Sequence, residues 1–156
     1  MRTHLTVARI MFAAVALTSA VAATPANSSI SANKSYVVRL TGDAEAASAR
    51  AAGLGGDMDG SGLVRLTVYP DERRLCYDFK LANLATPLMA HIHRGPAIGN
   101  GPSVVTLFTG PGGELDGCIM WTEKRLAEIV AAPSRFYVDL ATTEYPEGAI
   151  RGQLPG

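Results

Sequence analysis

Apolar and polar residues alternate with a period of two along most of the chain beyond residue 35. Residues 63–69 place Val64, Leu66 and Val68 on one side of an extended chain, and residues 74–81 alternate in the same way. This period is typical of strands with one buried face, and turns rich in Gly, Pro and Asp separate the segments. Further strands are predicted at residues 36–40, 88–94, 103–108, 117–121, 135–142 and 149–154.

Short strands at this spacing predict an all-β fold, an antiparallel and Greek-key-like β-sandwich, rather than an α/β fold. The inward positions of the strands predict one core shared between two sheets. Its expected members are Leu66, Val68, Tyr77, Phe79, Ile92, Val138, Leu140 and Ile150.

One segment departs from the two-residue period and predicts a short helix. Thr122 is a suitable N-cap, and Leu126, Ile129 and Val130 form an apolar stripe at helical spacing. Pro133 ends the run. We expect one short crossover helix that covers an end of the sandwich.

The first residues have the pattern of a secretory signal peptide. Arg2 and Arg9 form a basic region, residues 10–23 are uncharged and mostly apolar, and cleavage is expected near Ala22 or Ala23. A membrane anchor is the alternative, but about fourteen apolar residues are too few for a bilayer core that needs roughly twenty. The expected division is a signal peptide at 1–23, a linker at 24–34 and one domain at 35–156, in a secreted or periplasmic protein.

The remaining chain is close to electrically neutral. The sequence has 14 Lys and Arg and 14 Asp and Glu, and loss of Arg2 and Arg9 with the leader leaves 12 basic side chains. Nucleic-acid binding requires a concentrated basic face, so no nucleic-acid partner is expected. No later segment is long and apolar enough to anchor the chain in a membrane after cleavage.

Cys76 and Cys118 are the only cysteines of the chain. In an oxidising compartment, a disulfide between them is the default expectation. Free or metal-bound thiols are the alternative, although the two residues are far apart in sequence and no CxxC accompanies them. Because Cys76 falls on the outward phase of its strand, its partner should approach from a neighbouring strand or loop.

Two turn regions imitate binding sites. Residues 57–62 resemble the opening of a calcium-binding EF-hand loop, but the twelfth position is Val68 instead of glutamate. Tyr145 and Pro146 precede the last strand and are either the rim of a site or ordinary turn residues. We interpret both regions as turns.

His91 and His93 carry the clearest candidate chemistry. Residues i and i+2 of a strand share a face, so both imidazoles project together while Ala90 and Ile92 point the other way. Two neutral imidazoles suit copper or zinc better than calcium. Two ligands seldom hold a metal alone, however, and neighbouring histidines often only form hydrogen bonds at a loop edge.

Several motifs in order resemble the CHRD (chordin) domain family, from about Tyr36 to Leu154. The resemblance implies a single-domain, secreted or periplasmic β-sandwich of the bacterial type, similar in architecture to the superoxide-dismutase and immunoglobulin sandwiches, with a poorly defined biochemical role. It implies the fold and not a reaction, because a dismutase needs more histidines than this chain offers. The matching segments are residues 75–77, 90–96, 100–102, the helix ending at Pro133, 136–138 and 150–153.

The chain departs from the family pattern at three places. Ala141 stands where the family usually has a histidine, and Ala149 stands where it usually has a glutamate. Residues 42–46 replace an acidic-proline motif after the first strand. These losses weaken a metal-dependent or catalytic role and favour a structural or binding role.

Strand alternation and the family resemblance together predict one shallow polar patch. We expect His91, His93 and Arg151 to line it, with Asp139 nearby and the glycine-rich loop 95–102 at its border. Asp139 is a candidate third metal ligand, a partner that orients a histidine, or a partner of Arg151. A guanidinium beside neutral imidazoles disfavours a cation, so an anionic or hydrogen-bonding ligand is expected to suit the patch better.

Two functions are consistent with these residues. The favoured one is a non-catalytic module that binds an extracytoplasmic protein, a glycan or another envelope component. The alternative is a copper- or zinc-binding metalloprotein, including a redox-active one, that uses His91 and His93. No complete catalytic set is recognisable in the sequence, which favours the binding module over an enzyme.

Overall fold

The computed structural model describes residues 33–49 and 55–156. The predicted signal peptide and nearly all of the predicted linker lie outside these residues, so both stay predictions. Within the described part of the chain, no helix is long and apolar enough to cross a membrane.

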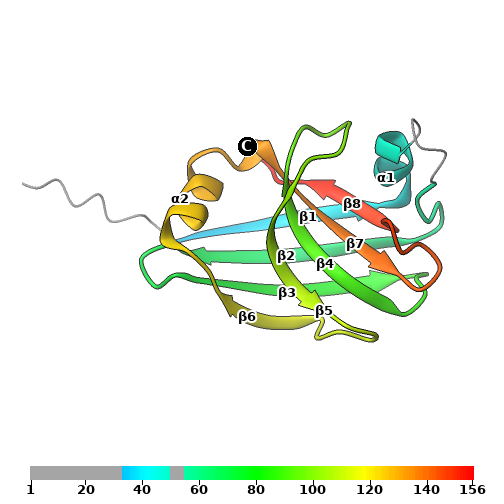
Figure 1. The fold of residues 1–156 in the computed structure, drawn as a ribbon, viewed down its shortest axis with the longest axis horizontal. Helices are drawn as coiled ribbons and strands as arrows, with labels where there is room; N and C mark the ends of the chain where they lie inside the picture. The colour runs from blue at the N-terminus through cyan, green and yellow to red at the C-terminus, as the bar shows by residue number, and fades with distance from the viewer. Residues whose placement is uncertain (1–32, 50–54) are drawn as a thin grey trace, which may run out of the picture.

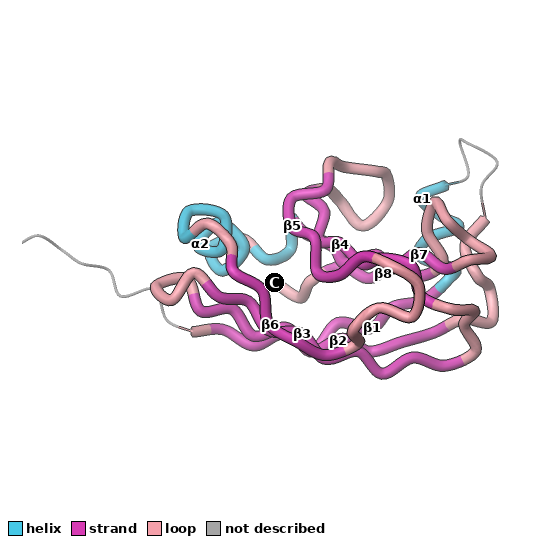
Figure 2. Tube along the Cα trace, turned by 60° about the horizontal axis from the view of Figure 1, so that its bottom comes forward, coloured by secondary structure: helices cyan, strands magenta, loops and turns pink. Residues whose placement is uncertain are grey.

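Eight strands form one antiparallel sheet whose two halves face each other (Figures 1 and 2). The strand order is β5-β4-β7-β8-β1-β2-β3-β6, and the halves join where Thr41 of β1 pairs with Arg151 of β8. The strands are β1 (Lys34–Thr41), β2 (Ser61–Tyr69), β3 (Arg74–Ala82), β4 (Pro87–Arg94), β5 (Ser103–Thr109), β6 (Asp116–Met120), β7 (Phe136–Thr142) and β8 (Ile150–Gln153).

The predicted all-β, antiparallel class is confirmed. The two layers of the expected sandwich are, however, the halves of a single curled sheet that is nearly closed like a barrel. Alternation along a strand reports which face is buried but carries no information about which strands pair. The sequence pattern therefore could not predict that the two layers belong to one continuous sheet.

The core lies between the two halves and contains the predicted residues. Val64, Leu66 and Val68 of β2 are fully buried, as their shared face requires. From the opposite half, Ile92 of β4 and Val138 of β7 are also fully buried. All eight residues predicted for the core belong to one cluster, which also contains Tyr36, Val38, Leu40, Leu75, Leu107 and Phe136.

The predicted crossover helix is present as α2 (Glu123–Ala131), between β6 and β7. Thr122 caps it, because the Thr122 hydroxyl oxygen accepts a hydrogen bond from the backbone N–H of Arg125. The helix lies at one end of the molecule (Figure 1), and its Leu126 and Ile129 are buried in the core. A short 3₁₀ turn, Pro133–Arg135, then leads into β7.

The expectation of a single helix is wrong, because residues 42–49 form a second helix, α1 (Gly42–Ala49). Alanine has the highest helix propensity, and Asp43 and Glu45 place negative charge in the first turn, where the helix dipole favours it. The Thr41 hydroxyl oxygen accepts a hydrogen bond from the backbone N–H of Ala44. The helix has no apolar stripe, so the hydrophobic pattern did not indicate it.

The predicted disulfide joins β3 to β6. Cys76 and Cys118 are directly opposite each other in the antiparallel register, with Cα atoms 4.0 Å apart. The partner of Cys76 thus comes from a neighbouring strand, as its outward phase predicted. Within the described residues no free cysteine is present, which removes the alternative of metal-bound thiols.

Residues 57–60 form the turn that leads into β2, and residues 61–62 already belong to that strand. The Asp57 carboxylate accepts a hydrogen bond from the backbone N–H of Gly60, and the Asp57 backbone N–H donates to the carbonyl oxygen of Ala149. Asp57 is buried and serves this turn. The turn interpretation is therefore supported over an EF-hand loop.

Candidate functional site

Strand β4 presents the two histidines on the face that points away from the core. Ala90 and Ile92 are fully buried, and His91 and His93 alternate with them. The two imidazole centroids lie 5.7 Å apart with their planes nearly perpendicular. The side chains remain 20% and 16% exposed, although Nε2 of His93 is itself buried.

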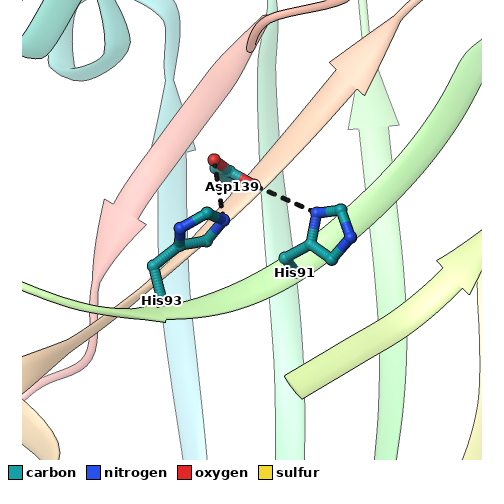
Figure 3. A group of neighbouring side chains, drawn as sticks. All are labelled: His91, His93 and Asp139. Carbon is teal, nitrogen blue, oxygen red and sulfur yellow. Dashed lines mark ion pairs between the residues drawn. The ribbon is translucent and has the colours of Figure 1, made fainter. Parts of the chain in front are cut away.

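Strand β7 brings Asp139 between the two imidazoles (Figure 3). In the antiparallel register, His91 is opposite Asp139, and His93 is opposite Tyr137. His91 Nδ1 lies 3.9 Å from Asp139 Oδ1, and His93 Nε2 lies 3.2 Å from Asp139 Oδ2. We call His91, His93 and Asp139 the histidine patch.

The ring of His93 is held in one orientation. Its Nδ1 lies 2.8 Å from the carbonyl oxygen of Gly101, which only accepts hydrogen bonds, so Nδ1 carries a hydrogen and donates it. The ring also stacks on Tyr137, with centroids 4.9 Å apart and 13° between the planes. Consequently His93 Nε2 is the nitrogen that faces Asp139 (Figure 3).

The loop 95–102 forms one wall of the histidine patch and is held by three strands. The backbone N–H of Gly101 donates to the Tyr137 hydroxyl oxygen at 3.1 Å, in addition to the contact between Gly101 and His93. Gln153 donates from its side-chain amide to the carbonyl oxygen of Gly95. The wall is thus built into the fold and does not depend on a ligand.

Arg151, which was predicted to line the patch, lies beside it and is buried. Its side chain is fully buried, and the residue is 1% exposed. The guanidinium donates to the carbonyl oxygens of Gly99 and Pro96, at 3.1 and 3.0 Å, and approaches the side-chain oxygen of Asn100 at 3.4 Å. Loop carbonyls without strand partners need donors, and a guanidinium supplies several. The guanidinium of Arg151 therefore holds the loop 95–102 beside the patch.

Glu45 is a member of this region that sequence reasoning missed. It projects from the first turn of α1, is 5% exposed, and its Oε2 has no hydrogen-bond partner among the described residues. It packs against Gly148, where the absence of a side chain leaves room for the carboxylate, because an added Cβ would lie 2.8 Å from Glu45 Oε1. The only feature of the sequence that could have indicated Glu45 is its position as an acidic residue in an alanine-rich segment after β1.

The charges around the patch shift the pKa values of its members in different directions. Burial lowers the pKa of His91, and Asp139 offsets this only in part. Burial also lowers the pKa of His93, but Asp139 and the hydrogen bond to Gly101 outweigh it, so that pKa is raised. Burial, followed by repulsion from Asp139, raises the pKa of Glu45. Near neutral pH, His93 therefore carries more positive charge than His91.

The remaining sequence candidates contribute no ligand to the patch. Ala141 and Ala149 are buried, and neither side chain can bind a metal or a proton. Tyr145 serves the turn between β7 and β8, since its backbone N–H donates to the Thr142 hydroxyl and its carbonyl oxygen accepts from Thr142 and Gly148. These contacts support the turn interpretation of Tyr145.

Among the described residues, one group of three metal-ligating side chains converges. His91, His93 and Asp139 each offer a ligand atom, and these atoms all lie within 4.8 Å of one another. The same three side chains are also a set of hydrogen-bonding groups for a polar ligand. The geometry thus places Asp139 close to both histidines, as one of the sequence alternatives proposed.

The comparisons with known proteins agree with the fold. The family model described as the CHRD domain matches residues 36–154, which is most of the chain. No curated protein and no solved structure matches it. The CHRD domain is an extracellular-type module, and the disulfide of this chain is consistent with secretion. With its antiparallel strands, its Cys76–Cys118 disulfide and this match, the chain belongs to the CHRD domain family.

Proposed function

We propose that this protein is a secreted or periplasmic module that binds a component of the cell envelope through the histidine patch, without catalysing a reaction. The extracellular type of the domain and its disulfide support this compartment. The basic and apolar pattern of residues 1–23 supports export of the chain.

The observation that carries the proposal is the convergence of His91, His93 and Asp139 beside a wall that is already in place. The patch is polar and partly exposed, and the loop 95–102 is fixed by hydrogen bonds from Arg151 and Gln153. A site of this kind loses little conformational entropy when a ligand binds. The patch is therefore suited to recognition.

Two groups that an enzyme could use are already committed elsewhere. Cys76 and Cys118 are joined in the disulfide of β3 and β6, so neither is a nucleophile. Arg151 directs its guanidinium to the loop 95–102 and is not free to stabilise a developing negative charge. These assignments favour a binding role over a catalytic one.

A second candidate function is that of a copper- or zinc-binding protein. The specific observation in its favour is the close approach of Asp139 to both imidazoles, which adds the third ligand that the HxH pair lacked. Redox chemistry is not part of this proposal.

Sedimentation with washed envelope particles from the host cell tests the binding function. The wild-type protein is expected to sediment with the particles in a saturable manner, and the His91→Ala/His93→Ala variant is expected to stay in solution. The matched control is Arg65→Ala/Thr67→Ala, which changes two outward residues at the same spacing on β2. Equal sedimentation of the wild type and the histidine variant contradicts the proposal, and so does a wild-type protein that does not sediment.

A further inference from the structure

The histidine patch has the donor set and the spacing of a transition-metal site. We propose that His91, His93 and Asp139 bind one Zn²⁺ or Cu²⁺ ion. This inference rests on the same patch as the proposed function and names the class of ligand that the patch takes.

One distance between donor atoms already matches a tetrahedral ion, and the three ligand atoms all lie within 4.8 Å of one another. Donors that lie about 2.0–2.1 Å from a tetrahedral ion are roughly 3.3 Å from each other. His93 Nε2 and Asp139 Oδ2 are 3.2 Å apart, so they need no rearrangement. His91 Nδ1 and Asp139 Oδ1 are 3.9 Å apart, which a small rotation of either side chain closes.

His93 shows the arrangement that a metal-binding histidine requires. A histidine ligand usually donates its other ring N–H to a carbonyl or carboxylate oxygen, which fixes the tautomer and the ring orientation. His93 Nδ1 does this with the carbonyl oxygen of Gly101, and stacking on Tyr137 adds a second restraint. Nε2 is therefore the nitrogen left for the ion.

His93 Nε2 is also a buried polar atom without a satisfactory partner. It has no hydrogen bond of acceptable geometry among the described residues, although Asp139 Oδ2 is close. In the neutral ring, Nε2 presents a lone pair, and it faces a carboxylate oxygen that also only accepts. Two facing acceptors are unfavourable unless a proton bound to Nε2 or a metal ion lies between them. A divalent ion that bonds to both atoms removes this conflict.

The local charges permit a cation despite Arg151. Sequence reasoning held that this guanidinium would disfavour a metal. In the structure, its donors point to the loop 95–102, and the guanidinium carbon lies 3.5 Å from the centre of the Tyr137 ring. Glu45 lies within electrostatic range of both Asp139 and Arg151. The guanidinium is thus placed near the carboxyl groups of both Asp139 and Glu45.

The choice of metal follows from the ligand types. Two imidazoles and one carboxylate suit zinc and copper, whereas calcium and magnesium take mainly oxygen ligands. Three protein ligands leave at least one coordination position open on a four-coordinate ion. Because the three side chains are 16–20% exposed, that position is open to water or to an oxygen of a bound envelope component.

Metal titration of the purified protein tests the inference directly. The chain is expressed for export by its host, purified without a histidine tag and with its disulfide intact, and freed of metal with EDTA. Zn²⁺ and Cu²⁺ are then titrated separately, with stoichiometry from elemental analysis. We expect one equivalent of either ion to bind. Electron paramagnetic resonance spectra of the bound Cu²⁺ should indicate two nitrogen ligands.

The variants distinguish this site from nonspecific binding. Asp139→Asn preserves side-chain shape, and each of His91→Ala and His93→Ala removes one nitrogen. Each is expected to weaken metal binding by at least about 100-fold. Loss of a ligand should lower the affinity more than loss of a residue that only orients a ligand, which costs about 10–100-fold. Arg65→Ala/Thr67→Ala should bind as the wild type does. Near-ultraviolet circular dichroism establishes that each variant is folded.

Two results overturn the inference: no binding of either ion at micromolar concentrations, or binding that persists unchanged in folded Asp139→Asn and His93→Ala. Sedimentation with envelope particles in the presence of EDTA separates this failure from failure of the proposed function. If sedimentation depends on the histidines but no metal binds, only the metal-site inference is refuted. If metal binds specifically but the protein does not sediment, only the proposed envelope-binding function is refuted.

Discussion

The guanidinium carbon of Arg151 lies 3.5 Å from the centre of the Tyr137 ring, and the ring of His93 stacks on the same Tyr137 with centroids 4.9 Å apart. Arg151, Tyr137 and His93 thus form a stack that begins at the last strand and ends at the histidine patch. Each member also holds the loop 95–102, through the carbonyl oxygen of Gly99, the backbone N–H of Gly101 and the carbonyl oxygen of Gly101 respectively. The wall of the site and the orientation of its central histidine therefore depend on the same contacts.

Replacement of Arg151 by lysine tests this dependence. Lysine keeps the charge but loses the planar fork, so hydrogen bonds to Gly99 and Pro96 cannot both be made. We expect the free energy of unfolding to fall by about 1–3 kcal/mol and amide exchange in residues 95–102 to accelerate. Urea denaturation and hydrogen exchange measure the two effects. Arg65→Lys, on the exposed face of β2, should change neither, and unchanged exchange in Arg151→Lys contradicts the assignment.

The core makes a second prediction. Phe79 is buried between the two halves of the sheet and meets Tyr77 and Phe108 in edge-to-face contacts, with ring centroids 5.9 Å away in each case. Phe79→Ala should lower the free energy of unfolding by about 3–5 kcal/mol in urea denaturation. A loss below about 1 kcal/mol would mean that this side chain does not contribute to the core as described.

The disulfide should contribute strongly to stability. It closes a loop between residues 42 positions apart, for which the chain-entropy model gives about 4 kcal/mol. The Cys76→Ser/Cys118→Ser variant should therefore unfold at a lower urea concentration, with a free energy of unfolding reduced by about 4 kcal/mol. Thiol titration of the wild type in denaturant without reductant should find no free thiol, and two free thiols would be incompatible with the structure.

The two histidines should titrate at different pH values in the metal-free protein. Nuclear magnetic resonance should find a higher pKa for His93, which Asp139 and Gly101 raise, than for His91, which burial lowers. Asp139→Asn should lower both values because Asp139 raises each of them. An inverted order of the two pKa values would refute the assignment of the His93 contacts.

These shifts also determine the sign of the effect on stability. Since the pKa of His93 is higher in the folded protein, its protonation stabilises the fold below the unfolded pKa of about 6.5. That contribution disappears as the pH rises through the folded pKa. His91 has the opposite shift, so its contribution is present above the unfolded pKa and is lost as the pH falls through the folded pKa.

The sequence was sufficient for the features that depend on alternation and local capping. The period of two predicted the buried face of Val64, Leu66 and Val68, and it placed His91 and His93 together on the opposite face of β4. These are properties of a single strand. The proximity of Asp139 is different, because it depends on the register between β4 and β7, which strand periodicity does not determine.

The burial of Arg151 and Glu45 could not be predicted for a related reason. Both side chains are covered by segments that are distant in sequence, Arg151 by the loop 95–102 and Glu45 by the turn at Gly148. On a strand pattern, Arg151 has an outward position, and only the tertiary fold shows that the outward face is covered there. Helix α1 was missed because it lacks an apolar stripe.

Anomalous diffraction at the zinc edge tests the central claim most directly. Crystals of the exported protein grown with one equivalent of Zn²⁺ should contain one anomalous peak, about 2.0–2.2 Å from His91 Nδ1, His93 Nε2 and one carboxylate oxygen of Asp139. The peak should be absent from crystals of Asp139→Asn grown in the same way. A histidine patch without a peak, or zinc found only at other residues, would contradict the account.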